Sequence, residues 1–229
     1  MAQEAHRLDP ALVPAACLIA RHQVANDLPR KALKLLRETW NLYKHPDLAD
    51  IAARAIPGDG PEARYERVRD LVGRTDDNIE SACALAKAAI PARRLDVARE
   101  ALAPFVAERP QARVCALMGE IEDAAGDKGK SREWFARAVS APRDPMWVSD
   151  GVASPRWRPV SPVTGEIVPC EWKVPFDVLP LAQIEAPVES QPGLPDTKSL
   201  AAPGEAAAPI AFQRPPDDPG VEKDANQDG

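Results

Sequence analysis

Histidine is the residue type that most often supplies a metal ligand or a general base, and this chain has three. They are His6, His22 and His45. A metal site needs at least two ligands on one face, for example two histidines at positions i and i+4 of a helix, and these three are too far apart for that. We therefore expect no metal ion.

Cysteine is the second candidate, and the spacing of the four cysteines again argues against chemistry. No pair forms the CxxC motif of a redox or zinc site. Three of them lie beside alanine and leucine in helical patterns, where a free cysteine packs as a small apolar side chain in a reducing compartment. Disulfide or ligand roles stay open as the alternative. The cysteines are Cys17, Cys83, Cys115 and Cys170.

Acidic pairs occur at Glu120/Glu122 and Asp76/Asp77. Spacings of one and two residues place such side chains on different faces of a helix, so these pairs do not act together as acid and base. The sequence contains no nucleophile elbow and no glycine-rich phosphate loop. We expect no catalytic residues and no cofactor.

A repeated layout of helices is the strongest pattern in the chain. In the segment 112–145, Gly119 falls where one helix must lie close to its partner, and Phe135 and Ala138 recur at helical spacing in a second helix. Pro110 and Pro145 end successive units, and they lie one residue off the 34-residue period of tetratricopeptide arrays. Such arrays hold other molecules and rarely catalyse reactions.

The apolar periodicity predicts about eight helices in four antiparallel pairs. Pro104 lies inside one of the predicted helices, so we expect a kink or a late start there. The predicted ranges are 10–26, 31–43, 47–55, 63–72, 79–90, 94–108, 111–125 and 130–139.

Composition divides the chain into three parts. Nine of the 25 prolines precede Ala141 and sixteen follow it. We predict a helical repeat domain at 1–141, a Trp/Pro-rich capping segment at 142–185 and a disordered acidic tail at 186–229. The tail carries eight acidic and three basic residues, so most of the net charge of −6 lies there. The remainder has no basic block, and nucleic-acid binding is not expected.

The capping segment contains Trp147, Trp157 and Trp172. Burial of a side chain of this size is worth about 2–3 kcal/mol, so we expect the segment to be ordered and packed on the open end of the last helix pair. Short strands are expected at 146–148 and 156–159. The alternative is that the three tryptophans form an aromatic docking surface for a partner.

Three stretches carry a family resemblance. They are WNLYKHPDLA (40–49), APRDPMW (141–147) and WRPVSPVTGEIVPCEWKVP (157–175). Together they resemble the C-terminal part of the HemY family, tetratricopeptide membrane proteins of proteobacterial haem biosynthesis. The resemblance covers about residues 1–178. The segment from Trp147 is also similar to a zinc ribbon with Ser149 and Ser161 at ligand-like places, although only Cys170 remains there.

The resemblance implies a bacterial inner-membrane protein whose repeat domain acts at a late stage of protohaem synthesis. Family members carry two N-terminal membrane helices, and no apolar run of this chain approaches the ~20 residues that cross a bilayer. We therefore expect this chain alone to be soluble, on the cytoplasmic side.

These observations favour a non-catalytic scaffold whose partners are other proteins, among them haem-pathway enzymes. The alternative is a carrier that binds haem or a porphyrin directly. Haem capture normally needs an axial ligand, and the plausible donors are His22, His45 and Cys170.

Overall fold

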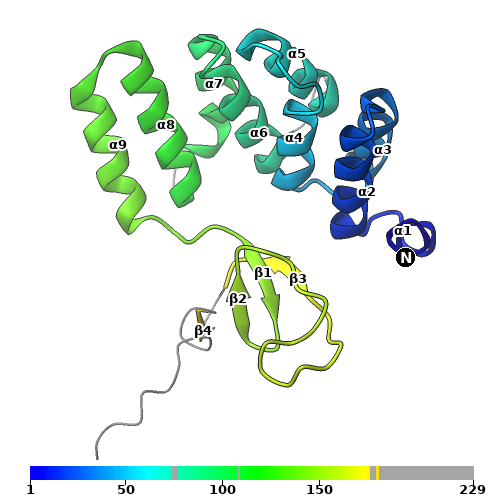
Figure 1. Cartoon of the computed structure of the whole chain (residues 1–229). Coiled ribbons are helices and arrows are strands. Elements are labelled where there is room, and N and C mark those ends of the chain that lie inside the picture. The colour runs from blue at the N-terminus through cyan, green and yellow to red at the C-terminus, as the bar shows by residue number, and fades with distance from the viewer. Residues whose placement is uncertain (74–76, 108, 176–178, 181–229) are drawn as a thin grey trace, which may run out of the picture. The chain divides into compact units, whose positions relative to one another are not determined.

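The computed structural model describes residues 1–73, 77–107, 109–175 and 179–180. Within them the chain is an all-α, tetratricopeptide-like array followed by a small sheet (Figure 1). Four antiparallel helix pairs follow a short first helix, as predicted. The helices are α1 (Ala2–Leu8), α2 (Val13–Ala25), α3 (Pro29–Leu42), α4 (Pro46–Ala53), α5 (Pro61–Val72), α6 (Ile79–Ala89), α7 (Leu95–Leu102), α8 (Ala112–Ala125) and α9 (Lys128–Ser140).

Proline and capping residues fix where the helices begin. Pro29, Pro46 and Pro61 each occupy the first position of a helix, where the missing N–H costs no hydrogen bond. The side chain of Asn78 accepts a hydrogen bond from the N–H of Glu80 at the start of α6. These local signals explain why most helix boundaries lie within two residues of the predicted ones.

Pro104 ends α7 early. The α-helix stops at Leu102 and continues as a single 3₁₀ turn, Ala103–Phe105. A proline inside a helix removes one backbone donor and its ring clashes with the preceding turn, which accounts for the change. The predicted range of 94–108, with a kink or a late start at Pro104, is therefore wrong beyond Leu102: the proline ends the α-helix instead of kinking it.

Two clusters of buried side chains stabilise the array. One lies among α2, α3 and α4, with Leu36, Trp40 and Leu48 at its centre, each at most 1% exposed. The other lies among α5 to α8, around Leu102 and Ile121. Fully buried alanines recur in both clusters, and their small size lets neighbouring helices approach closely.

Gly119 is the point of closest approach between α8 and α9. A Cβ atom at this position would lie 2.9 Å from Cε1 of Phe135. The aromatic ring therefore occupies the space that any side chain at position 119 would need. Ala138 is half-buried on the same helix as Phe135.

The residues after α9 form a four-stranded sheet in the order β3–β1–β2–β4. Strands β1 (Met146–Ser149) and β2 (Val152–Ser154) form a hairpin, and β3 (Glu171–Lys173) pairs antiparallel to β1. Strand β4 (Leu179–Pro180) pairs parallel to β2. The predicted strand at 146–148 is confirmed. The one at 156–159 is wrong, because those residues form a loop of bends and irregular backbone.

The position of the sheet corrects the expectation of a cap on the last helix pair. Trp147 belongs to the buried cluster of α2, α3 and α4, and Trp157 and Trp172 pack against that same cluster. On α9, Ser131 is the buried residue, while Phe135 and Val139 are 41% and 89% exposed. The tryptophans therefore pack against the first helices, which have a buried apolar cluster, and not against α9, whose apolar side chains Phe135 and Val139 stay exposed.

The helices and the sheet belong to one compact unit. The predicted boundary between residues 141 and 142 falls between the end of α9 at Ser140 and the start of β1 at Met146. The predicted tail, 186–229, lies outside the described residues. Among the helices described, none combines the length and apolar character needed to span a bilayer.

Replacing Gly119 with leucine should destabilise the protein by about 2 kcal/mol, because the side chain overpacks the contact with Phe135. Urea unfolding measures the loss. In a Phe135→Ala background the same replacement should cost much less, since the ring is gone. Gly129→Ala is the control: position 129 lies in the first turn of α9, an added Cβ would lie 3.4 Å from Oδ1 of Asp127, an ordinary contact distance, and the change should stabilise by about 0.5 kcal/mol. An unchanged unfolding midpoint for Gly119→Leu would contradict the contact.

Candidate partner-binding groove beside the tryptophan cluster

Trp147 and Trp172 lie side by side on one face of the sheet. They are directly paired in the register of β1 and β3, and their ring centroids are 5.5 Å apart in an edge-to-face arrangement. Both rings also contact His45, at centroid distances of 5.0 Å and 4.3 Å. We call these three residues the tryptophan cluster. It joins residues that are about one hundred positions apart in the chain.

His45 is a structural residue in this arrangement. It caps α4, where its Nδ1 accepts a hydrogen bond from the N–H of Asp47 at 3.1 Å. An accepting Nδ1 places the ring proton of the neutral form on Nε2. The ring is 1% exposed, and burial lowers its pKa to about 4, despite the opposing effect of the Glu80 carboxylate. His45 is therefore neutral at physiological pH.

Three buried nitrogens of the cluster have no hydrogen-bond partner among the described residues. They are Nε2 of His45 and Nε1 of Trp147 and Trp172. Unpaired buried donors reduce stability, and here the rings around them make one stacked and two edge-to-face contacts. The cluster consequently depends on close aromatic packing.

A buried ion pair holds the linker between α9 and β1. Arg113 donates two hydrogen bonds to the carboxylate of Glu80, at 2.6 and 2.7 Å. The N–H of Arg113 also donates to Asp144, two residues before β1. Removing one member of such a pair leaves a buried charge, which typically costs about 3–5 kcal/mol. These contacts fix the point at which the chain leaves the helices for the sheet.

A hollow of about 420 Å³ lies between the start of α2 and the sheet. All three tryptophans of the capping segment line it, Trp157 and Trp172 being half-buried and Trp147 only 6% exposed. We call it the tryptophan hollow. Its other lining residues are Asp9, Ala11, Leu12, Val13, Pro14, Tyr43, Cys170, Glu171 and Lys173.

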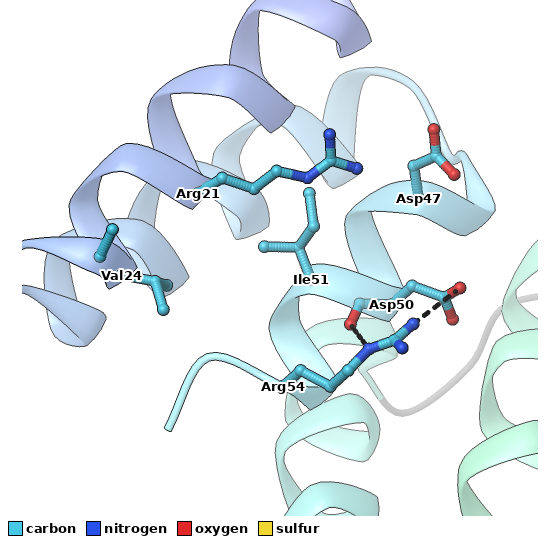
Figure 2. A pocket seen from close by; sticks show the side chains of 7 residues that line it. Arg21, Val24, Asp47, Asp50, Ile51 and Arg54 are labelled. Carbon is cyan, nitrogen blue, oxygen red and sulfur yellow. Dashed lines mark hydrogen bonds and ion pairs between the residues drawn. The ribbon is translucent and has the colours of Figure 1, made fainter. Parts of the chain in front are cut away.

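A second hollow, of about 580 Å³, continues along α2 and shares Trp147 and Trp157 with the first. Its polar lining includes Arg21, Asp47 and Arg156, so we call it the arginine hollow. A third, of about 450 Å³, lies between α2 and α4 and shares Arg21 and Asp47 with the second. Figure 2 shows Arg21 extending from α2 between Asp47 and Ile51. We refer to the three together as the α2 groove.

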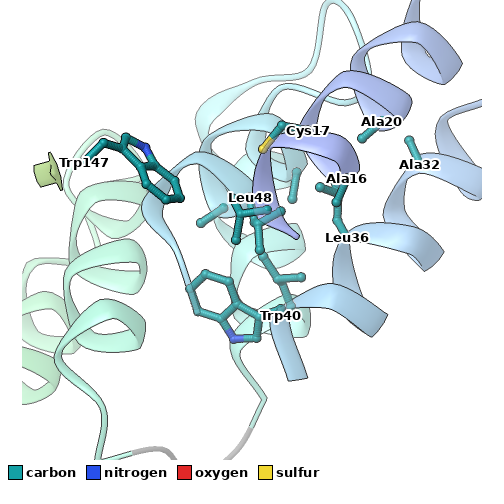
Figure 3. Close-up of a cluster of buried hydrophobic side chains, with 12 residues drawn as sticks. Ala16, Cys17, Ala20, Ala32, Leu36, Trp40, Leu48 and Trp147 are labelled. Carbon is teal, nitrogen blue, oxygen red and sulfur yellow. The ribbon is translucent and has the colours of Figure 1, made fainter. Parts of the chain in front are cut away.

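The predicted docking residues thus differ in role. Trp147 serves mainly as a core residue, and Figure 3 shows its ring directed toward Leu48 and Cys17 of the first helices. Trp157 and Trp172 remain available from the groove. Gly119, Phe135 and Ala138 lie on α8 and α9, outside the groove lining.

The residues considered as haem or metal ligands are not brought together. His22 is exposed, with its ring beside the side-chain amide of Asn26, and His45 is enclosed in the tryptophan cluster. Cys170 lines the tryptophan hollow, and burial raises the pKa of its thiol, which disfavours the thiolate that a metal requires. Within the described part of the chain, no three histidine, cysteine or acidic residues are grouped to hold a metal ion.

Of the two serines at ligand-like places, Ser161 has structural hydrogen bonds instead, whereas the hydroxyl of Ser149 has no partner among the described residues. Ser161 is 2% exposed, and its hydroxyl donates to Asp150 and accepts from the N–H groups of Val163 and Thr164. Ser149 is buried in β1. A serine hydroxyl thus organises the turn where a zinc ribbon would use a metal-bound thiolate.

Sequence reasoning missed the residues from α2 and from the loop after β2. Leu18 is 56% exposed on α2, beside Arg21, and both line the arginine hollow with Arg156. The available signal was a leucine outside the main apolar stripe of an otherwise buried helix. Their meeting with Arg156 depends on the tertiary packing of the sheet.

The titration of His45 should make stability pH-dependent. Its folded pKa, about 4, lies below the unfolded value of about 6.5, so protonation favours the unfolded state. The resulting stability is complete above pH 6.5 and is lost as the pH falls toward 4. Between pH 7 and pH 5 the loss amounts to about 2 kcal/mol.

Urea unfolding at the two pH values of wild type and His45→Asn tests this. Asparagine keeps a capping oxygen but does not titrate, so the variant should lose about 2 kcal/mol less than wild type. His22→Asn, at an exposed position, should behave like wild type. Equal losses in wild type and His45→Asn would show that His45 is not buried in its neutral form.

Comparison with known proteins gives distant relatives. No family model matches the chain. A probable magnetosome protein, Mms48 of Magnetospirillum gryphiswaldense, is 26% identical over 176 residues, which cover 75% of this chain and 39% of the relative. The chain thus spans about two-fifths of that relative's length. The crystal structure of MamA aligns with a TM-score of 0.36 at 16% identity, over 61% of this chain and 83% of that chain.

Proposed function

We propose that this chain is a non-catalytic scaffold module that binds other proteins through the α2 groove. The observation that carries the proposal is the joint lining of this groove by the helical array and by the sheet. Leu18 of α2 and the half-buried Trp157 border the same hollow, so an apolar contact surface is left open next to charged side chains. Tryptophan and arginine are the residue types most enriched at energetically important interface positions.

We also propose which partners the module binds and at which cellular location. The motifs at 40–49, 141–147 and 157–175 resemble the HemY family, and on that basis we assign the partners to late protohaem synthesis at the bacterial inner membrane. The similarity to a probable magnetosome protein favours a second setting, the magnetosome. Both settings make the groove a contact surface for proteins.

A direct role as a haem or porphyrin carrier is supported less well. Cys170 does line the tryptophan hollow, but burial raises the pKa of its thiol, and the ring of His45 is enclosed between two tryptophans. A haem carrier requires an accessible axial ligand, whereas a scaffold requires only an open surface such as the α2 groove.

Site-specific photo-cross-linking in the native host tests the scaffold. With benzoylphenylalanine at Leu18, discrete protein adducts should form, because this side chain is exposed within the groove. Trp157→Ala should reduce their yield. The same cross-linker at Val139, 89% exposed on α9, is the control and should not give these adducts.

Mass spectrometry of the adducts identifies the setting. Haem-synthesis enzymes are the expected partners, and magnetosome proteins would replace the haem assignment while leaving the scaffold in place. If position 18 gives no discrete adduct, or gives the same adducts as position 139, the scaffold proposal is wrong.

A further inference from the structure

The charged side chains of the α2 groove differ in whether they have ion-pair partners. Next to Leu18 and Trp157, the arginine hollow presents the side chains of Arg21 and Arg156, both exposed. Among the residues that the structure describes, neither guanidinium forms an ion pair. Several other arginines, such as Arg67, Arg94, Arg99 and Arg113, have a carboxylate partner.

Nearby acids balance these two arginines only in part. Asp47 lies close enough to Arg21 for the guanidinium to lower its pKa, but among the described residues the two side chains form no ion pair. Asp50 is already bound by Lys87 and Arg54. The arginine hollow therefore has two arginines against one aspartate in its lining, a net positive charge next to the apolar side chains of Leu18 and Trp157.

We propose that this part of the α2 groove binds an acidic–apolar segment of a partner protein. An apolar side chain of the segment packs against Leu18 and Trp157, and adjacent carboxylates accept hydrogen bonds from Arg21 and Arg156. Arginine suits this task because its planar guanidinium can bind a carboxylate with two parallel hydrogen bonds. The inference rests on the proposed function and names the chemistry of the partner.

The dimensions and the charges of the groove fit a short protein segment better than a polyanion. Helix α2 has 13 residues and is about 20 Å long, which an extended segment of about six residues can follow. Asp47, which has no lysine or arginine ion-pair partner among the described residues, also lines the groove and would repel a continuous phosphate backbone. Isolated carboxylates separated by apolar residues avoid that repulsion.

Selection of peptides from a random twelve-residue phage-display library on the purified chain tests the inference. The enriched sequences should combine aspartate or glutamate with leucine, isoleucine or an aromatic residue. The double variant Arg21→Glu/Arg156→Glu should bind the selected peptides at least about tenfold more weakly in fluorescence anisotropy. Binding to wild type should also weaken as salt increases.

The control variant is Arg30→Glu/Arg37→Glu. It changes the net charge equally at two exposed positions of α3 outside the groove lining, and it should bind like wild type. Circular dichroism of both variants should match wild type, because the four positions are exposed.

Three outcomes would overturn the inference: no enrichment, enrichment of basic or uncharged peptides, or equal effects of the two double variants. Peptides that lose affinity with Trp157→Ala but not with Arg21→Glu/Arg156→Glu would leave the groove as a binding site and remove only the acidic partner. Loss of the cellular adducts at position 18 would instead remove the scaffold itself.

Discussion

The contact of Trp147 and Trp172 with His45 is the interaction on which the rest of the structure depends. Two small elements meet there that would be weak alone: a sheet whose strands are two to four residues long, and the short helix α4 that His45 caps. Through these rings the sheet joins the buried cluster of the first helices, which contains Trp147 and against which Trp172 packs. The neutral state of His45 is part of the contact, because a charged imidazole between two indoles would have to be desolvated.

The same contact creates the binding surface. Once β1 is held against the first helices, the loop after β2 places Trp157 and Arg156 opposite α2, so the groove has one wall from each element. The linker contacts of Arg113 with Glu80 and Asp144 set the direction in which the chain reaches that position. Chain segments far apart in sequence thus supply a surface that the helix pairs alone would not have.

The helices could be predicted from the sequence because their determinants are local: apolar residues at helical spacing, prolines at first positions and glycine at the close contact of α8 and α9. The hairpin also has a local determinant in the sequence, the dipeptide Asp150-Gly151. Asp150 and Gly151 both have positive φ between paired strands, as expected of an Asp-Gly turn. The site of docking could not be predicted in this way. It depends on Trp147 and Trp172 sharing a sheet register and on His45 being enclosed, and both follow from long-range packing.

Hydrogen exchange of wild type and Trp147→Ala, followed by mass spectrometry, tests the central claim most directly. If the sheet is held by the first helices, loss of this ring should accelerate exchange in α2 and α4, where Cys17 and Leu48 belong to the same buried cluster. Exchange in α8 and α9 should stay unchanged. Acceleration in α8 and α9 with no change in α2 and α4 would contradict the account, because it would place the tryptophans on the last helix pair.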